Sequence, residues 1–500
     1  MNLFDILEKN DQIQVHIIHE LLDQESEIAE KTLMERQKIT RFLFNTNLSQ
    51  LIQRLSELDI GIQIVESRRG RTKYLALKCQ ADADIAQLYY SYLKESPNYR
   101  LIHDVFFQPN YTMDFLTRDL LISEPVVYRR LTCINQRLRE FKIQITGTNI
   151  EGTSLQVCYF YYEFYWNSVP VEELERQLTK ATVWQLVHQV EAAINVQLAH
   201  SEQLRLYLWL AVINHYPIEQ PNQSLSDSIL EELQDQPIIN RLVARGFGRT
   251  QALFCYLFLT TQLVLTPSAQ TDQLLMPSPL KKVRQTMQTV LAVGQEQYEL
   301  TLDRLESTLI RNWMQTLNQL NTRFYLFSGM VFFYKRNYYQ PPLTLPLSIA
   351  DKRLVAHILA ATQDQLGVRL TADQADNLSS IIQFCIESIK RFSPLTLKVG
   401  IYSAANYLAA QSLLTSLKDF SHLGKTVQWE VAKPDQRYDL LVTDTRAALA
   451  DFHYREGYLL SGAPNLKRDA RAITRLIDQG IKEVHERRPP QIEMKDLHLE

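Results

Sequence analysis

The stretch TMDFLTRDLLISEPVVYRRLTCINQRLREF (112–141) predicts two short helices joined by a tight turn. Ser123 stands where the second helix would begin, where its hydroxyl can accept a hydrogen bond from an unpaired backbone N–H. Pro125 falls in the first turn of that helix, where a missing amide hydrogen costs little. The second helix has apolar residues at helical spacing, which predicts one buried face. These residues are Val127, Leu131, Ile134 and Leu138.

The other face of this second helix is basic, with Arg129, Arg130, Arg137 and Arg139. An apolar-backed helix with a basic outer face, following a short helix and a turn, is typical of a helix-turn-helix. KIQITG and SLQVCYF alternate like two strands around residues 147–152 and predict a wing after it. The competing interpretation is an ordinary helical hairpin with a solvated face. The residues expected to contact DNA here are Ser123, Glu124, Tyr128, Arg129, Arg130 and Arg137.

A unit of the same kind precedes this one. Helices are expected over residues 11–23 and 31–41, and a third is expected after the break Asn45-Thr46-Asn47. The core face of the third helix is Leu48, Leu51, Ile52, Leu55 and Leu58. Its outer face can hydrogen-bond base edges or phosphates. The residues of that outer face are Ser49, Gln50, Gln53 and Arg54.

Two alternating strands follow and predict a hairpin with a positively charged tip. The basic residues at the tip are Arg68, Arg69, Arg71 and Lys73. Such a tip can be merely solvated, but its position directly after three helices favours a wing that contacts DNA.

The rest of the chain shows two further secondary-structure patterns, a long helical stretch and then an alternation of strands and helices. Helices near Asp84–Lys94 and Tyr99–Phe107 open the second unit, and the aromatic run CYFYYEFYW (158–166) is expected to end its wing and seed the next core. Residues 171–392 are almost wholly helical, and proline-rich breaks at 267–279 and 341–346 predict two successive all-α bundles. From Leu395 on, short buried strands alternate with helices, which predicts a small parallel α/β sheet.

Composition limits the partners and the compartment. A length of 500 residues predicts several domains, and a net charge of −3 means that any nucleic-acid contact must come from local patches. The apolar runs are too short for a membrane span, and the N-terminal residues lack the shape of a signal peptide. Five scattered cysteines without a CxxC motif predict a reducing, cytoplasmic setting and argue against zinc.

No motif argues for catalysis, and neither a metal nor another cofactor is expected. Gly424-Lys425-Thr426 resembles the end of a phosphate-binding loop, but Asp419 stands where that motif needs its first glycine. A carboxylate at this place would repel phosphate, so we reject the motif.

The order of these parts resembles the Mga/AtxA family of bacterial transcriptional regulators, and FLTRDLLISEPVVYRRLTCINQRLREFKI (115–143) is similar to that family's second helix-turn-helix. The resemblance implies winged helix-turn-helix domains at 1–80 and 81–165 and phosphotransferase-regulation domains at 166–280 and 281–392. It also implies a domain similar to sugar-phosphotransferase IIB proteins at 393–500. The implied partners are duplex DNA, a second copy bound through the C-terminal domain, and a phosphocarrier protein.

The chain departs from the regulatory pattern of that family. Its bundles usually carry a phosphorylatable histidine followed by an arginine, and those places look like Tyr207 and Asn214 here. The histidines that remain as candidate phosphorylation sites are His200, His215 and His357, and a structural role is the competing interpretation of each. A IIB enzyme needs a thiol just after its first strand, whereas this chain offers Tyr402 and Ser403, so phosphoryl transfer there is not expected.

Two other classes of function compete with a DNA-binding regulator. One is a phosphotransferase-system protein, against which the missing thiol weighs. The other is an RNA-binding antiterminator, but two predicted winged helices favour duplex DNA. In the predicted helix Leu466–Ile481, an apolar side formed by Ala470, Ile473, Leu476 and Ile477 is expected either to form the dimer interface or to cover the domain's own sheet; an exposed sheet edge is the other candidate interface.

Overall fold

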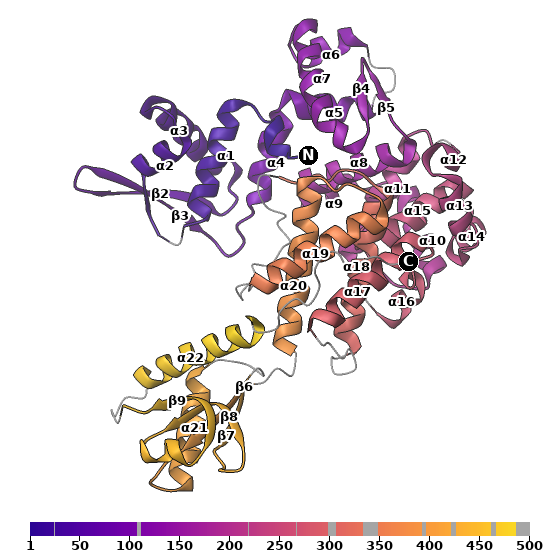
Figure 1. The fold of residues 1–500 in the computed structure, drawn as a ribbon. Helices are drawn as coiled ribbons and strands as arrows, with labels where there is room; N and C mark the ends of the chain where they lie inside the picture. The colour runs from indigo at the N-terminus through magenta and orange to yellow at the C-terminus, as the bar shows by residue number, and fades with distance from the viewer. Residues whose placement is uncertain are drawn as a thin grey trace. The chain divides into compact units, whose positions relative to one another are not determined.

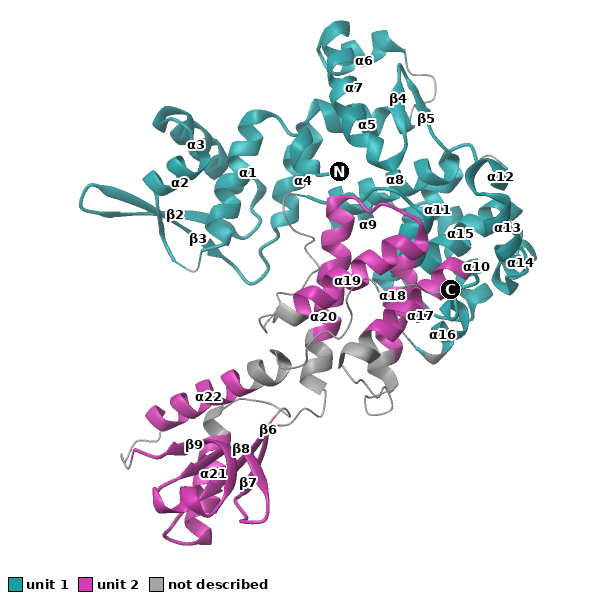
Figure 2. Cartoon of the chain, viewed as in Figure 1, with its two compact units in different colours: residues 1–280, 322–340 teal, residues 281–321, 341–500 magenta. Residues whose placement is uncertain are grey.

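The computed structural model describes residues 1–24, 26–107, 112–218, 220–266, 268–298, 307–333, 349–392, 397–421, 427–461 and 467–486. The chain is a mainly helical multidomain protein with a small parallel sheet near its C-terminus (Figure 1). It forms two compact units, Met1–Leu280 with Thr322–Gln340 and Lys281–Asn321 with Pro341–Glu500 (Figure 2). The expected break at 341–346, the rejected motif at 424–426 and the polar tail from 487 lie outside the described residues.

The N-terminal part of the first unit is a three-helix unit followed by a hairpin. Its strands form an antiparallel sheet in the order β1-β3-β2. The elements are η1 (Leu3–Ile6), α1 (Lys9–Leu22), β1 (Ile28–Ala29), α2 (Glu30–Gln37), α3 (Arg41–Leu58), β2 (Ile62–Arg69) and β3 (Thr72–Cys79).

The expected break at Asn45-Thr46-Asn47 is wrong, because α3 runs through it. The helix begins at Arg41, about two turns before Leu48, and the Thr40 hydroxyl caps it by accepting a hydrogen bond from the Leu43 amide at 3.3 Å. Asn47 is tolerated inside the helix because its side chain has partners there. Its amide nitrogen donates to the Leu43 carbonyl at 2.9 Å, and its amide oxygen accepts from Gln14 at 3.4 Å.

Residues 81–165, within the first compact unit, contain the predicted pair of helices. The four apolar residues of the second of these helices are all buried. Its wing is shorter than expected, since β4 pairs with β5 over three residues each. The elements are α4 (Ile85–Glu95), α5 (Pro97–Phe107), α6 (Met113–Asp119), α7 (Glu124–Leu138), η2 (Arg139–Phe141), β4 (Gln144–Thr146) and β5 (Asn149–Glu151).

The segment SLQVCYF, expected to be a strand, is instead the start of α8 (Ser154–Ser168). Thr153 caps this helix by accepting from the Gln156 amide at 3.4 Å. The aromatic run is buried on nearly every side of α8, so its expected place in the next core is confirmed. Burial therefore overrides the strand preference of these aromatic side chains. The remaining helices before residue 280 are α9 (Val171–Gln177), α10 (Ala181–Ile194), α11 (His200–His215), α12 (Pro221–Ser224), α13 (Asp227–Leu233), α14 (Pro237–Val243), α15 (Arg249–Thr261) and α16 (Ala269–Leu275).

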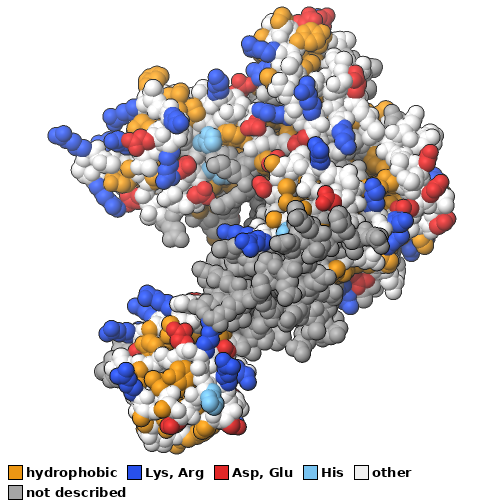
Figure 3. Space-filling model, viewed as in Figure 1, with side chains coloured by type: hydrophobic (Ala, Val, Ile, Leu, Met, Phe, Trp, Pro, Cys, Tyr) orange, Lys and Arg blue, Asp and Glu red, His pale blue; other side chains and the backbone are white. Residues whose placement is uncertain are grey.

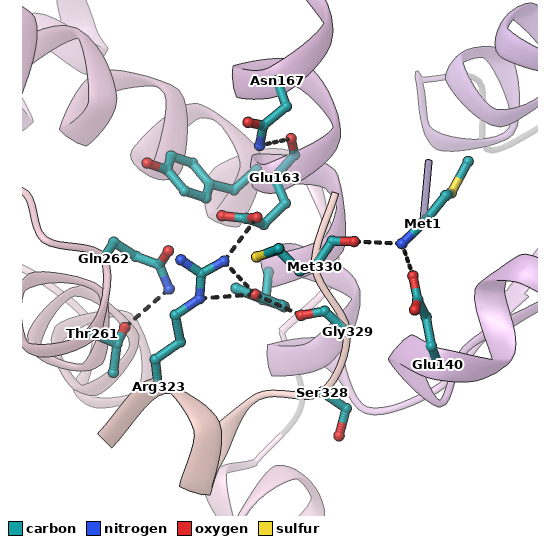
Figure 4. Close-up of polar contacts among 12 residues, drawn as sticks. Met1, Glu140, Glu163, Asn167, Thr261, Gln262, Arg323, Ser328, Gly329 and Met330 are labelled. Atoms are coloured by element: carbon teal, nitrogen blue, oxygen red, sulfur yellow. Dashed lines mark hydrogen bonds and ion pairs between the residues drawn. The ribbon is translucent and has the colours of Figure 1, made fainter. Parts of the chain in front are cut away.

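A buried ion pair holds α8 to the last turn of α18 (Ser307–Leu326). Arg323 meets the Glu163 carboxylate at 2.9 Å, and Figure 4 shows the two side chains pointing at one another. The Arg323 guanidinium also donates to the Tyr159 hydroxyl at 2.8 Å, which in turn donates to the Gly329 carbonyl at 3.0 Å. Gly329 has a φ of +81°, and a Cβ there would lie 2.6 Å from the Phe141 ring, so this turn requires glycine.

The second compact unit contains further helices and the predicted parallel sheet. The sheet order is β7-β6-β8-β9, and all three pairings are parallel. Ala470, Ile473 and Ile477 are buried in the core of this sheet, so the apolar side of α22 covers its own domain and is not a free dimer surface. The further elements are α17 (Lys281–Tyr298), α19 (Ile349–Leu366), α20 (Ala372–Phe392), β6 (Leu397–Tyr402), α21 (Tyr407–Ser421), β7 (Val427–Val431), β8 (Arg437–Thr443), η4 (Ala447–Ala450), β9 (His453–Leu459) and α22 (Lys467–Glu486).

Replacement of Glu163 by methionine is expected to lower the free energy of unfolding of the first compact unit by about 3–5 kcal/mol, because it leaves the buried Arg323 charge unpaired. The double variant Glu163→Met with Arg323→Met removes both charges and is expected to recover most of that loss. The pair Glu173–Arg176, at 2.9 Å, is the control: its arginine is exposed and its carboxylate is partly exposed, so Glu173→Met should cost less than about 1 kcal/mol. Thermal and urea unfolding measure these differences, and a double variant no more stable than Glu163→Met would contradict the account.

Candidate nucleic-acid interface

The helix α7 presents an outward stripe on the side opposite its buried face. The stripe consists of Pro125, Arg129, Thr132 and Gln136, all of them exposed. Tyr128 is half-exposed beside it, and Glu124 is exposed in the first turn. Ser123 occupies the expected N-cap position, but its hydroxyl makes no cap hydrogen bond. Its carbonyl instead accepts from the Val126 and Val127 amides at 2.9 and 3.1 Å, which leaves the exposed hydroxyl available to a ligand.

Two of the arginines predicted to contact DNA are used inside the protein. Arg130 pairs with Glu8 at 2.8 Å and donates to the Asn98 side chain at 3.1 Å. Arg137 lies 3.6 Å from the Asp5 carboxylate. The prediction for these two residues is therefore corrected: they tie α7 to the N-terminal segment. At about 100° per residue, both lie on the flank of the buried face, whereas Arg129 lies almost opposite to it.

The helix α3 repeats this arrangement with a less charged outward stripe. The stripe consists of Phe42, Thr46, Ser49 and Gln53, all exposed. Phe42 retains 82% of its accessible surface, which is high for a large apolar side chain. Phe42 and Thr46 were not among the predicted residues, because the helix was expected to begin at Leu48. Of the predicted residues, Ser49 and Gln53 lie on the stripe, while Gln50 is exposed beside it and accepts a hydrogen bond from Gln14 at 3.2 Å.

Arg54, predicted to contact DNA, instead ties α3 to α4. Its guanidinium makes two hydrogen bonds to the Glu95 carboxylate, at 3.0 and 2.7 Å, and one to the Ser91 hydroxyl at 3.1 Å. It also lies 4.3 Å from the centre of the Tyr92 ring. Arg54 is half-buried by these partners, so it is a positioning residue of α3 and not a free cation.

The β2–β3 hairpin ends in a two-residue turn of Gly70 and Arg71, with Gly70 at a φ of +62° as a II′ turn requires. Lys and Arg side chains gather over the end of this hairpin (Figure 3). Arg68 and Arg71 are exposed and have no ion pair within the described part of the chain. Arg69 and Lys73 are partly occupied, by Glu27 at 3.1 Å and Glu66 at 2.7 Å.

Two of the three candidate phosphorylation histidines, His200 and His215, lie at opposite ends of α11, and His357 lies on α19. His200 is exposed at the start of α11, with its Nε2 2.8 Å from Glu175. The Nε2 of His215 lies 2.9 Å from the Phe106 carbonyl, and its ring packs on Phe106 and Phe107. His357 is half-buried on α19. Of the three histidines, His215 has the surroundings that best fit a structural role.

The end of β6, where a IIB enzyme carries its thiol, is closed by a carboxylate. The Ser403 hydroxyl donates to Asp444 at 2.5 Å, and the Ala404 amide donates to the same carboxylate at 2.9 Å. These donors are thus already used, and a negative charge stands where an incoming phosphate would need positive ones.

The described chain thus has two helices, α3 and α7, each with a buried face and an outward exposed stripe. Residues 81–165 match the family model of the Mga helix-turn-helix domain. The chain is also 21% identical over 169 residues to a protein of Streptococcus pneumoniae serotype 4 (strain ATCC BAA-334 / TIGR4) described as a "Putative trans-acting regulator". That match covers 32% of this chain and 32% of the relative. Residues 81–165 are thus similar to the helix-turn-helix domain of Mga regulators, and about a third of the chain is similar to part of a protein described as a regulator. Among the described residues, every helix is too short or too polar to cross a lipid bilayer.

The packing of α1 against α3 gives the N-terminal helices a specific pH dependence. Burial raises the pKa of the Asp11 carboxyl from 3.8 to about 6, against the attraction of Arg54 and with the help of Glu95 and Glu8. The folded state therefore holds a proton that the unfolded state releases between about pH 4 and 6. This contribution to stability is present below pH 4 and is lost as the pH rises through 6.

The variant Asp11→Asn is expected to melt at a higher temperature than the wild type at pH 7.5 and at nearly the same temperature at pH 4. The amide carries no charge to desolvate, whereas the wild-type carboxylate is ionised only at the higher pH. Asp235→Asn, at an exposed position, is the control and should show no such difference. An equal effect of Asp11→Asn at both pH values would rule out this explanation.

Proposed function

We propose that the chain is a DNA-binding transcriptional regulator of the Mga/AtxA type, which contacts duplex DNA through winged helix-turn-helix domains at 1–80 and 81–165. One observation carries the proposal. In both α3 and α7, one face is buried and one flank is tied to neighbouring elements, while the opposite stripe of side chains remains exposed. A recognition helix needs this combination, because it must be held firmly while it offers side chains to the major groove.

The exposed side chains of the two stripes and the hairpin can make different kinds of contact with DNA. Ser49, Gln53, Thr132 and Gln136 supply hydroxyl and amide groups that can hydrogen-bond base edges. Phe42 can make an apolar contact with a thymine methyl group. Arg129 and the hairpin residues Arg68 and Arg71 supply positive charge for phosphates, which fixes the register of the protein without reading sequence. Glu124 can accept a hydrogen bond from a cytosine amino group, and Ser123 and Tyr128 lie close enough along the chain to add contacts.

For the remaining chain, we propose phosphotransferase-regulation domains at 166–280 and 281–392 and a non-enzymatic IIB-like domain at 393–500. The closure of the β6 end by Asp444 supports a role in contact and not in phosphoryl transfer. We propose that this domain pairs with a second copy through the outer edge of β9, since α22 uses its apolar side internally. A phosphocarrier protein is the proposed source of the regulatory signal, and His200, whose side chain is 60% exposed, is the proposed acceptor.

Titration of duplex DNA binding against salt tests this function. The variant Arg68→Ala with Arg71→Ala is expected to weaken binding on all sequences and to reduce the slope of log affinity against log salt by up to about 1.8, at 0.9 per phosphate contact. Arg129→Ala is expected to weaken binding without loss of fold. Arg130→Ala should lower thermal stability as well, because it releases the N-terminal segment.

Arg176→Ala is the matched control and should bind like the wild type, because Arg176 is exposed on α9, outside the proposed DNA-binding domains at 1–80 and 81–165. Circular dichroism confirms that each variant is folded. Tighter binding to single-stranded RNA than to duplex DNA, or an affinity independent of salt, would overturn the proposed function. Wild-type affinity of both the hairpin variant and Arg129→Ala would overturn the assignment of these surfaces.

A further inference from the structure

The helix α22 carries a basic stripe that the two helix-turn-helix units do not explain. It consists of Arg468, Arg471 and Arg475, all exposed, at spacings of three and four residues. At 1.5 Å of rise per residue, the stripe is about 10 Å long. Figure 3 shows Lys and Arg side chains on this side of the C-terminal domain.

The three guanidinium groups lack acidic partners within the described residues. Asp478 is exposed three residues after Arg475, but no ion pair joins the two, and the carboxylate of the neighbouring Asp469 is occupied by Tyr458 and Ser461 at 2.9 Å each. Like charges at these spacings repel one another and cost a helix a few tenths of a kcal/mol per pair. In contrast, Arg54, Arg130 and Arg137 each meet a carboxylate. A stripe of this kind therefore differs from a solvated face on which charges of both signs alternate.

The chemistry of the stripe fits one kind of partner. A docking site for another protein needs an apolar or aromatic centre, but none of the exposed large hydrophobic residues of the described chain lies on α22. A helix that lies on a membrane needs a free apolar side, and that side of α22 is buried in the sheet core. A row of unpaired arginines without apolar neighbours matches a sugar-phosphate backbone, which asks for charge and little else.

We infer that α22 is a third DNA contact, which binds phosphates independently of sequence through Arg468, Arg471 and Arg475. The inference rests on the proposed function and assigns the C-terminal domain a direct part in it. The contact adds affinity and salt dependence to a complex whose sequence preference is set by α3 and α7.

The test uses the full chain and a duplex that the wild type binds. The triple variant Arg468→Gln, Arg471→Gln, Arg475→Gln is compared with Arg241→Gln, Lys352→Gln, Arg353→Gln, which removes the same charge from exposed helical positions elsewhere. The first variant is expected to reduce the salt slope by up to about 2.7, while the second leaves it near the wild-type value. The preference between two duplex sequences should be unchanged in both.

Photo-crosslinking provides a readout that does not depend on affinity or assembly. A p-benzoylphenylalanine in place of Arg471 is expected to crosslink to duplex DNA, and the same group in place of Arg353 is not. Light scattering reports the mass of each variant, and where the mass changes, the crosslink decides. If the triple variant keeps the wild-type salt slope and position 471 gives no crosslink, the inference is overturned. A stripe that binds an acidic protein instead of DNA would give this result. Failure of the wild type to bind duplex DNA would instead overturn the proposed function.

Discussion

The buried pair of Arg323 and Glu163 is the contact on which the first compact unit depends. Burial lowers the pKa of the Arg323 guanidinium, but Glu163 and Tyr159 outweigh this effect and raise it above its usual value. The group therefore stays charged inside the protein, and it must keep its partners because an unpaired buried charge is costly. The pair fixes α8, whose other sides contact α5 through the Tyr161 hydroxyl at 3.0 Å and α11 through Tyr162 and Arg205 at 3.0 Å.

This central position of α8 links the helical bundle to the second helix-turn-helix unit within the first compact unit. The helix α5 lies between α8 and α7, so the orientation of α7 depends on side chains that are far from its outward stripe. Polar contacts also hold α3 and α7 in place. Polar side chains on the flank of each recognition helix, Arg54 on α3 and Arg130 and Arg137 on α7, bond to neighbouring elements. Among the described cations that were predicted to contact DNA, Arg129 on the outward stripe of α7 and Arg68 and Arg71 at the hairpin tip have no ion pair.

The sequence predicted what depends on local periodicity. The buried face of α7, the β2–β3 hairpin after the first helices and the parallel C-terminal sheet follow from spacings of three and four residues, from alternation within strands or from strand-helix alternation. It did not predict which arginines are paired, because Glu95 lies 41 residues from Arg54 and Glu8 lies 122 residues from Arg130. It also misread two segments, SLQVCYF and Asn45-Thr46-Asn47, where tertiary burial and tertiary hydrogen bonds outweigh local preference. The flank position of Arg54, Arg130 and Arg137 was the available signal for their structural role.

We propose that α3 and α7 of one chain both contact duplex DNA, each as part of a helix-turn-helix. Hydroxyl-radical footprinting of the full-length protein, on a duplex selected from genomic fragments, tests it most directly. The account predicts two separate protected patches of sugar-phosphate backbone for each bound chain. Substitution of Arg68 and Arg71 should weaken one patch, and substitution of Arg129 should weaken the other. A single patch that responds equally to both sets of substitutions, or no protection of duplex DNA at all, would contradict the account.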